Sequence, residues 1–197
     1  MAGSNKFQPN SIFTGMLLIT YLCIGFIPNL GAVDKIAPQW LTLSILNLIS
    51  FIYLYSEREK FSSSLSAILR SWLSLTYICF ILWAGLSYFY SINPTEVIVN
   101  ITRQVNIMLM VILMATFLYQ FPKKGIFISW CITLILVFEV YAVLIDAQEM
   151  VNKTGVITAG TLKGVTANRN ITAFSLAIKI PFILFLFQLV SRRFIKV

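Results

Sequence analysis

The chain has 197 residues, of which 58% are hydrophobic and 11% are charged. Soluble domains carry about 25% charged residues, so this composition excludes an ordinary soluble fold and indicates a membrane protein. The net charge of +8 is typical of lysine and arginine residues that flank membrane helices, and we therefore expect no nucleic-acid partner.

Six segments have about the 20 apolar residues that a helix needs to cross a bilayer. In chain order they are residues 11–33, 38–56, 72–90, 97–119, 125–145 and 170–191. The pattern predicts an all-α fold, a polytopic integral membrane protein with about six transmembrane helices in a single transmembrane domain (1–197). A loop over residues 146–169 is expected between the last two helices.

The distribution of basic residues predicts the orientation. With the N-terminus in the cytoplasm, the inner segments hold most of the lysine and arginine residues. The positive-inside rule then places loop 146–169 on the outer side. Lys153, Lys163 and Arg169 in this region run against the rule, which indicates that they have a role other than setting the topology.

The segment 97–119 begins with a polar stripe. Glu96, Asn100, Arg103 and Gln104 project within one arc of a helix that turns by about 100° per residue. Two interpretations remain open. In one, Arg103 extends toward the interface and the amides bond neighbouring helices. In the other, the stripe is a cationic wall of an outward-facing cavity.

Glu139 and Lys179 are charged residues deep inside the last two predicted helices. At a rise of about 1.5 Å per residue their depths differ by only a few ångströms. They are expected either to form an ion pair, which avoids a lone buried charge, or to leave Lys179 facing an anion in a cavity. Pro181 removes a backbone hydrogen bond and is expected to bend the helix.

The residues before the last helix combine glycine, asparagine and basic side chains. Backbone N–H groups at a helix start favour anions, and Arg169 adds a bidentate fork for phosphate. Asn168 is a candidate N-cap, although an ordinary capped junction is the alternative interpretation. No nucleotide-binding fingerprint is present, and without histidine or paired cysteines no metal or other cofactor is indicated.

Three stretches resemble one family of membrane proteins. "WAGLSYFYSINPTEVIVNITRQV" (83–105), "GVTANRNITAFSLAIKIPF" (164–182) and "DKIAPQWLTLSILNLISF" (34–51) are similar to segments of bacterial O-antigen ligases and O-antigen polymerases. The resemblance implies a metal-independent, multi-pass glycosyltransferase of the bacterial inner membrane, which acts in lipopolysaccharide biosynthesis. It would transfer glycan from undecaprenyl-pyrophosphate to lipid A–core or a related acceptor at the periplasmic face.

The resemblance also implies roles for individual residues. Arg169 and Arg103 are expected to bind the carrier diphosphate, with Lys163 and Lys179 as second choices. The supporting polar residues would be Asn168, Asn170, Asn100, Glu96 and Glu139. The catalytic residue is unknown, because the family's histidine lies in a later periplasmic loop and this sequence has no histidine. We therefore expect the chain to be the N-terminal half of a longer protein.

Two other classes of function remain open. The chain is alternatively half of a membrane transporter or channel, in which Glu139, Lys179 and Arg103 line a permeation route. It is otherwise a non-catalytic membrane subunit whose polar groups only hold helices together.

Overall fold

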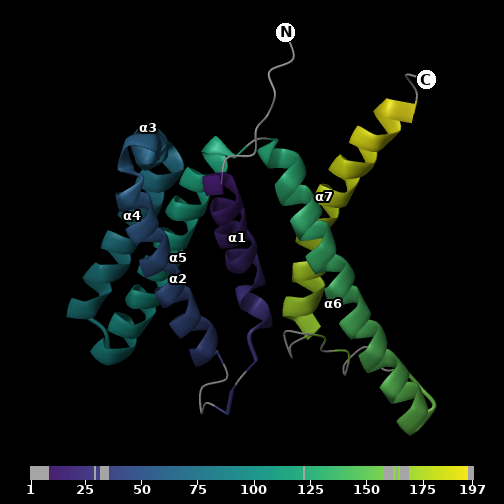
Figure 1. The fold of residues 1–197 in the computed structure, drawn as a ribbon. Coiled ribbons are helices and arrows are strands. Elements are labelled where there is room, and N and C mark those ends of the chain that lie inside the picture. The colour runs from purple at the N-terminus through teal and green to yellow at the C-terminus, as the bar shows by residue number, and fades with distance from the viewer. Residues whose placement is uncertain are drawn as a thin grey trace. The chain divides into compact units, whose positions relative to one another are not determined.

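The computed structural model describes residues 9–28, 30–31, 36–121, 123–157, 162, 164 and 169–194. These residues form helices and connecting turns, with no strand among them (Figure 1). The elements are α1 (Pro9–Cys23), η1 (Ile24–Phe26), α2 (Ala37–Ser56), α3 (Arg58–Leu69), α4 (Trp72–Leu86), η2 (Ser87–Phe89), α5 (Pro94–Gln120), α6 (Lys124–Thr154) and α7 (Arg169–Phe194). They divide into two compact units, residues 1–122 and 123–197.

Five helices of the described chain are long and apolar enough to cross a membrane: α2, α4 with η2, α5, α6 and α7. The first predicted span is a shorter apolar helix, Ile12–Phe26. Large aromatic side chains at the two ends of the α4–η2 segment, Trp72 and Phe89, are exposed, as in the aromatic belts of spanning helices. The prediction of an all-α polytopic membrane protein is confirmed.

Two helix ends differ from the predicted spans. The first helix stops at Phe26, because Ile27 is extended (φ −66°, ψ 123°) and the residue before a proline, here Pro28, disfavours the helical region. α6 continues to Thr154, so the first part of the predicted loop 146–169 is helical. Gly155, in the left-handed conformation with φ 72°, ends it.

α3 is a helix where the sequence predicted only a connection. It is the least apolar helix of the first unit, and it buries Phe61 and Ser64. The Phe61 ring packs edge-on against Phe117 of α5, with centroids 5.4 Å apart. The Gln120 side-chain amide, also from α5, donates hydrogen bonds to the Lys60 carbonyl and, at 2.9 Å, to the Ser64 hydroxyl. These contacts fix α3 against one end of α5.

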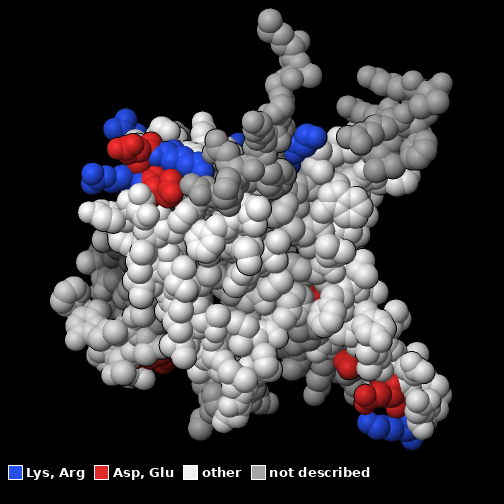
Figure 2. Space-filling model, viewed as in Figure 1, with Lys and Arg blue, Asp and Glu red and all other residues white. Residues whose placement is uncertain are grey.

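The charged side chains are concentrated at helix ends. Figure 2 shows lysine, arginine, aspartate and glutamate gathered over α3, and uncharged residues over the sides of the helices beside it. α3 and its flanks carry Glu57, Arg58, Glu59, Lys60 and Arg70. An uncharged belt below a charged end is what a bilayer requires of spanning helices.

α5 begins within the first stretch that resembles the O-antigen ligases. The Asn93 side chain accepts a hydrogen bond from the Glu96 backbone N–H at 3.3 Å, and Pro94 occupies the first turn. Asparagine at the N-cap followed by proline is a common helix start. The "NPTE" residues are therefore explained by capping alone, and they set where α5 begins.

In the second unit, α6 and α7 pack side by side and run antiparallel. Gly125 lies near Phe185, whereas Glu139, further along α6, contacts Lys179, which comes earlier in α7. α7 remains helical through Pro181. The antiparallel arrangement brings the start of α7 back along α6, and it places the predicted pair of charges side by side.

Candidate anion-binding cleft

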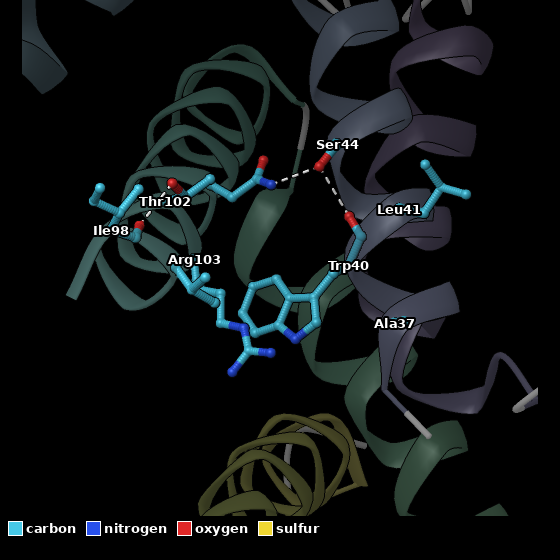
Figure 3. Close-up of a pocket in the computed structure, with 9 residues that line it drawn as sticks. Ala37, Trp40, Leu41, Ser44, Ile98, Thr102 and Arg103 are labelled. Carbon is cyan, nitrogen blue, oxygen red and sulfur yellow. Dashed lines mark hydrogen bonds between the residues drawn. The ribbon is translucent and has the colours of Figure 1, made fainter. Parts of the chain in front are cut away.

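A cleft of about 340 Å³ lies between α2 and α5 in the first unit (Figure 3). Its walls combine apolar residues with one cation and three uncharged polar side chains. The lining residues are Ala37, Trp40, Leu41, Ser44, Ile98, Val99, Thr102, Arg103 and Asn106. Apolar lining with a few converging polar groups is the usual composition of a small-molecule site.

Arg103 reaches across the cleft to the first turn of α2. Its guanidinium carbon lies 5.6 Å from the centre of the Trp40 ring, within the range of a cation–π contact. The start of α2 positions Trp40, because Pro38 occupies the first turn and the backbone N–H of Trp40 donates a hydrogen bond to the Ile36 carbonyl. The two helices thus hold a permanent positive charge at the cleft.

A network of hydrogen bonds forms the polar side of the cleft and continues into the core. The buried Asn47 amide donates to the Asn106 side-chain oxygen at 2.7 Å and to the Asn106 carbonyl at 3.0 Å. Tyr21 of α1 donates to Asn47 at 2.9 Å. Asn106 donates to the Ser44 hydroxyl at 2.6 Å, and Ser44 donates to the Trp40 carbonyl at 2.9 Å. Three helices are connected by this network.

The predicted polar stripe of α5 divides between different neighbours. Arg103 lines the cleft toward α2, whereas the Gln104 side chain accepts a hydrogen bond from Tyr77 of α4 at 2.8 Å. Glu96 and Asn100 are exposed and lie outside the cleft. Gln104 therefore bonds a neighbouring helix, as the first interpretation of the stripe expects. Arg103 lines a cleft, and the outward-facing cavity of the second interpretation stays a prediction.

Glu139 and Lys179 form an ion pair in the second unit. The ammonium lies 2.8 and 2.9 Å from the two carboxylate oxygens, and the side chains are only 10% and 16% exposed. The Ser175 hydroxyl lies 3.2 and 3.3 Å from the same oxygens and also contacts the ammonium. The carboxylate compensates the charge of Lys179, so this lysine is already partnered within its unit.

The start of α7 holds the remaining predicted residues. Arg169 and Asn170 are exposed in its first turn, whereas Lys163 and Asn168 lie outside the described residues. The Gly164 N–H donates to the Asp146 carboxylate at 2.7 Å. Gly164 has φ 55° and a Cβ there would lie 2.9 Å from Val143. Asp146, which was not among the predicted site residues, therefore holds Gly164 against α6.

No family model, no curated protein and no solved structure matches this chain. The resemblance to O-antigen ligases rests on its sequence motifs. Arg103 belongs to the first unit and Arg169 to the second, so their joint binding of one diphosphate stays a prediction. Among the described residues, no group of three or more cysteine, aspartate or glutamate side chains is placed to hold a metal ion.

Two contacts at the cleft were not predicted from the sequence. The Arg103–Trp40 contact depends on how α2 and α5 are rotated against each other, and nothing local specifies this. The Asn47–Asn106 contact had a signal, because each asparagine interrupts an apolar run of a predicted span. Amides in membrane helices commonly bond neighbouring helices, so both positions were recognisable as contact sites.

Proposed function

We propose that this chain is the carrier-binding part of an O-antigen ligase-like glycosyltransferase in the bacterial inner membrane. In this proposal the cleft between α2 and α5 binds the diphosphate of an undecaprenyl-pyrophosphate-linked glycan, and the glycan passes to lipid A–core or a related acceptor. The observation that carries the proposal is the Arg103 guanidinium held over Trp40 in a cleft with apolar walls.

The chemistry of the cleft matches an amphiphilic phosphate. Arg103 supplies a positive charge at the cleft, and a guanidinium can donate two parallel N–H bonds to a phosphate. Leu41, Ile98 and Val99 add apolar contacts beside the charge. A polyprenyl diphosphate needs both a cationic and an apolar contact, since its headgroup is anionic and its chain is hydrocarbon.

The proposed role in transfer is electrostatic. When the bond between the sugar and the diphosphate breaks, negative charge grows on the departing phosphate oxygen. A fixed guanidinium at that oxygen stabilises the charge without moving during the reaction. The group that takes the proton of the acceptor hydroxyl is unassigned.

The test is binding of farnesyl diphosphate, a soluble polyprenyl diphosphate, to the whole chain in lipid nanodiscs. We expect Arg103→Ala to raise Kd about ten- to a hundredfold, because a charge-assisted hydrogen bond contributes about 1.5–3 kcal/mol. Arg103→Lys is expected to lose part of the affinity, since lysine keeps the charge but lacks the planar fork.

Arg58→Ala provides the matched control. Arg58 is also an arginine over an aromatic ring, 6.0 Å from the centre of Tyr55, but it lies on α3 outside the cleft. The expected Kd for this variant is that of the unaltered chain. Equal Kd values for Arg103→Ala and Arg58→Ala would refute the proposal.

The contacts between helices favour a second candidate, a non-catalytic membrane subunit. Gln104 with Tyr77, Asn47 with Asn106 and Glu139 with Lys179 all join neighbouring helices, which is the role that this candidate assigns to polar groups. It predicts that farnesyl diphosphate does not bind and that Arg103→Ala lowers the thermal stability.

A further inference from the structure

We propose that Asn106 is a further ligand-contacting residue of the cleft, and that the buried Asn47 fixes the direction in which its amide points. This inference rests on the function proposed for the cleft. Asn106 was not among the residues expected to bind an anion, and it lines the cleft together with Arg103 of its own helix and Ser44 of α2. Its role follows from which of its atoms faces which partner.

The orientation of Asn47 is determined by a backbone carbonyl. Its amide group lies 3.0 Å from the Asn106 carbonyl oxygen, which can only accept a hydrogen bond. The nitrogen of Asn47, and not its oxygen, must therefore face α5. The oxygen then faces the Tyr21 hydroxyl, which donates to it at 2.9 Å. A flipped Asn47 would bring its oxygen against the Asn106 carbonyl oxygen and lose that contact.

The orientation of Asn106 follows from that of Asn47. Because the Asn47 nitrogen also lies 2.7 Å from the Asn106 side chain, the atom of Asn106 at that position must be its oxygen. The Asn106 nitrogen consequently faces the Ser44 hydroxyl and donates a hydrogen bond to it at 2.6 Å. The Ser44 hydroxyl in turn donates a hydrogen bond to the Trp40 carbonyl at 2.9 Å. Backbone carbonyls at both ends give the network a single direction.

This direction leaves a donor in the cleft. An amide nitrogen carries two hydrogens, and Ser44 uses one of those on Asn106. The hydroxyl hydrogens of Ser44 and Thr102 go to carbonyls of their own helices, the latter to Ile98 at 2.8 Å. Besides the Trp40 indole N–H, Asn106 therefore supplies an uncharged side-chain N–H in the α2–α5 cleft that can join Arg103 on an anion.

The test again uses farnesyl diphosphate and the whole chain in nanodiscs. Asn106→Asp keeps the shape of the side chain and still accepts from Asn47, but it replaces the donor by a carboxylate oxygen. We expect Kd to rise at least tenfold. Thr95→Asp is the control, since it introduces the same charge on α5 at an exposed position outside the cleft, and we expect at most a twofold change.

Three outcomes separate the proposals. If Asn106→Asp and Thr95→Asp change Kd equally while Arg103→Ala weakens binding, the role of Asn106 is wrong and the proposed function stands. If none of the three variants weakens binding, the proposed function itself fails. A large effect of Asn106→Asp and Arg103→Ala, with a small one for Thr95→Asp, supports both proposals.

The positioning role of Asn47 needs a measurement that a packing role would not change. Asn47→Leu is expected to raise Kd about threefold, and the effect of Asn106→Asp should be smaller in that background, as for coupled residues. Tyr21→Phe removes a contact with Asn47 but leaves the two bonds to Asn106. It should lower the thermal midpoint and leave Kd unchanged.

Equal Kd changes in Tyr21→Phe and Asn47→Leu would overturn the positioning role, because general loosening of the core would then explain both. If Asn47→Leu does not fold, Asn47→Ser replaces it. Serine cannot reach both Asn106 atoms, so the expected rise in Kd and the loss of coupling are the same.

Discussion

The ion pair of Glu139 and Lys179 allows a direct test of whether two buried charges stabilise the second unit by compensating each other. We compare Glu139→Gln, Lys179→Met and the double variant. Each single change leaves one charge without its partner among side chains that are only 10% and 16% exposed. The double change leaves none, and both replacements nearly keep the length of the original side chain.

The expected magnitude follows from the geometry. The ammonium contacts both carboxylate oxygens within 2.9 Å, and the Ser175 hydroxyl is the one further polar contact with the carboxylate that the described structure shows. Removing one partner of a buried pair costs about 3–5 kcal/mol, and a lone charge at the centre of a spanning helix costs about 2.5–3.5 kcal/mol on insertion scales. We therefore expect each single variant to lose about 3 kcal/mol, and the double variant to lose about 1 kcal/mol or less.

The measurement is the free energy of unfolding of the purified chain in mixed micelles, followed by tryptophan fluorescence and circular dichroism. Lys153→Met is the control, because Lys153 pairs with Glu149 at 3.2 Å while both side chains are largely exposed. Exposed pairs contribute about 0–1 kcal/mol, so little change is expected. A double variant as unstable as the sum of the two single variants would show that the charges do not interact, and would refute this reasoning.

Two further substitutions test the packing within each unit. Gly164→Ala should destabilise the second unit by about 1–3 kcal/mol, because the residue has φ 55° and its Cβ would lie 2.9 Å from Val143. Gly25→Ala is the control, because a Cβ at Gly25 would have no atom within 4 Å, and it should not destabilise the protein. Equal thermal midpoints for the two variants would contradict the strain expected at Gly164. Gln120→Leu should lower the free energy of unfolding by about 1 kcal/mol, because the hydrogen bonds to the Lys60 carbonyl and the Ser64 hydroxyl are lost. It should also speed cleavage by a protease within α3. An unchanged cleavage rate would show that α3 is held without this side chain.

The sequence was sufficient to predict the long helices because a bilayer demands long apolar runs, and these need no knowledge of tertiary packing. It was not sufficient for α3. That helix is polar over most of its length, and its place depends on Phe61 meeting Phe117, residues that are distant in sequence. The extension of α6 to Thr154 was missed for a similar reason, since residues 146–154 are too polar to be counted as part of a span.

The candidate sites were predictable to the extent that helix depth determines a contact. Glu139 and Lys179 pair because antiparallel helices of known rise bring equal depths together. Depth does not specify rotation about the helix axis. The positions of Arg103 over Trp40 and of Gln104 beside Tyr77 depend on that rotation. Two adjacent residues of the predicted stripe therefore contact different helices.

The proposed function predicts that the loss of Arg103 and the loss of the Glu139–Lys179 pair have different effects. Glu139 and Lys179 compensate each other, so loss of either one should reduce stability. Arg103 lies against the Trp40 ring at the α2–α5 cleft, where the proposed function gives it a role in binding. We expect Arg103→Ala to reduce the affinity for farnesyl diphosphate much more than it reduces the free energy of unfolding. A loss of stability as large as that of Lys179→Met, with no bound diphosphate to lose, would instead make Arg103 a structural residue and favour the non-catalytic subunit.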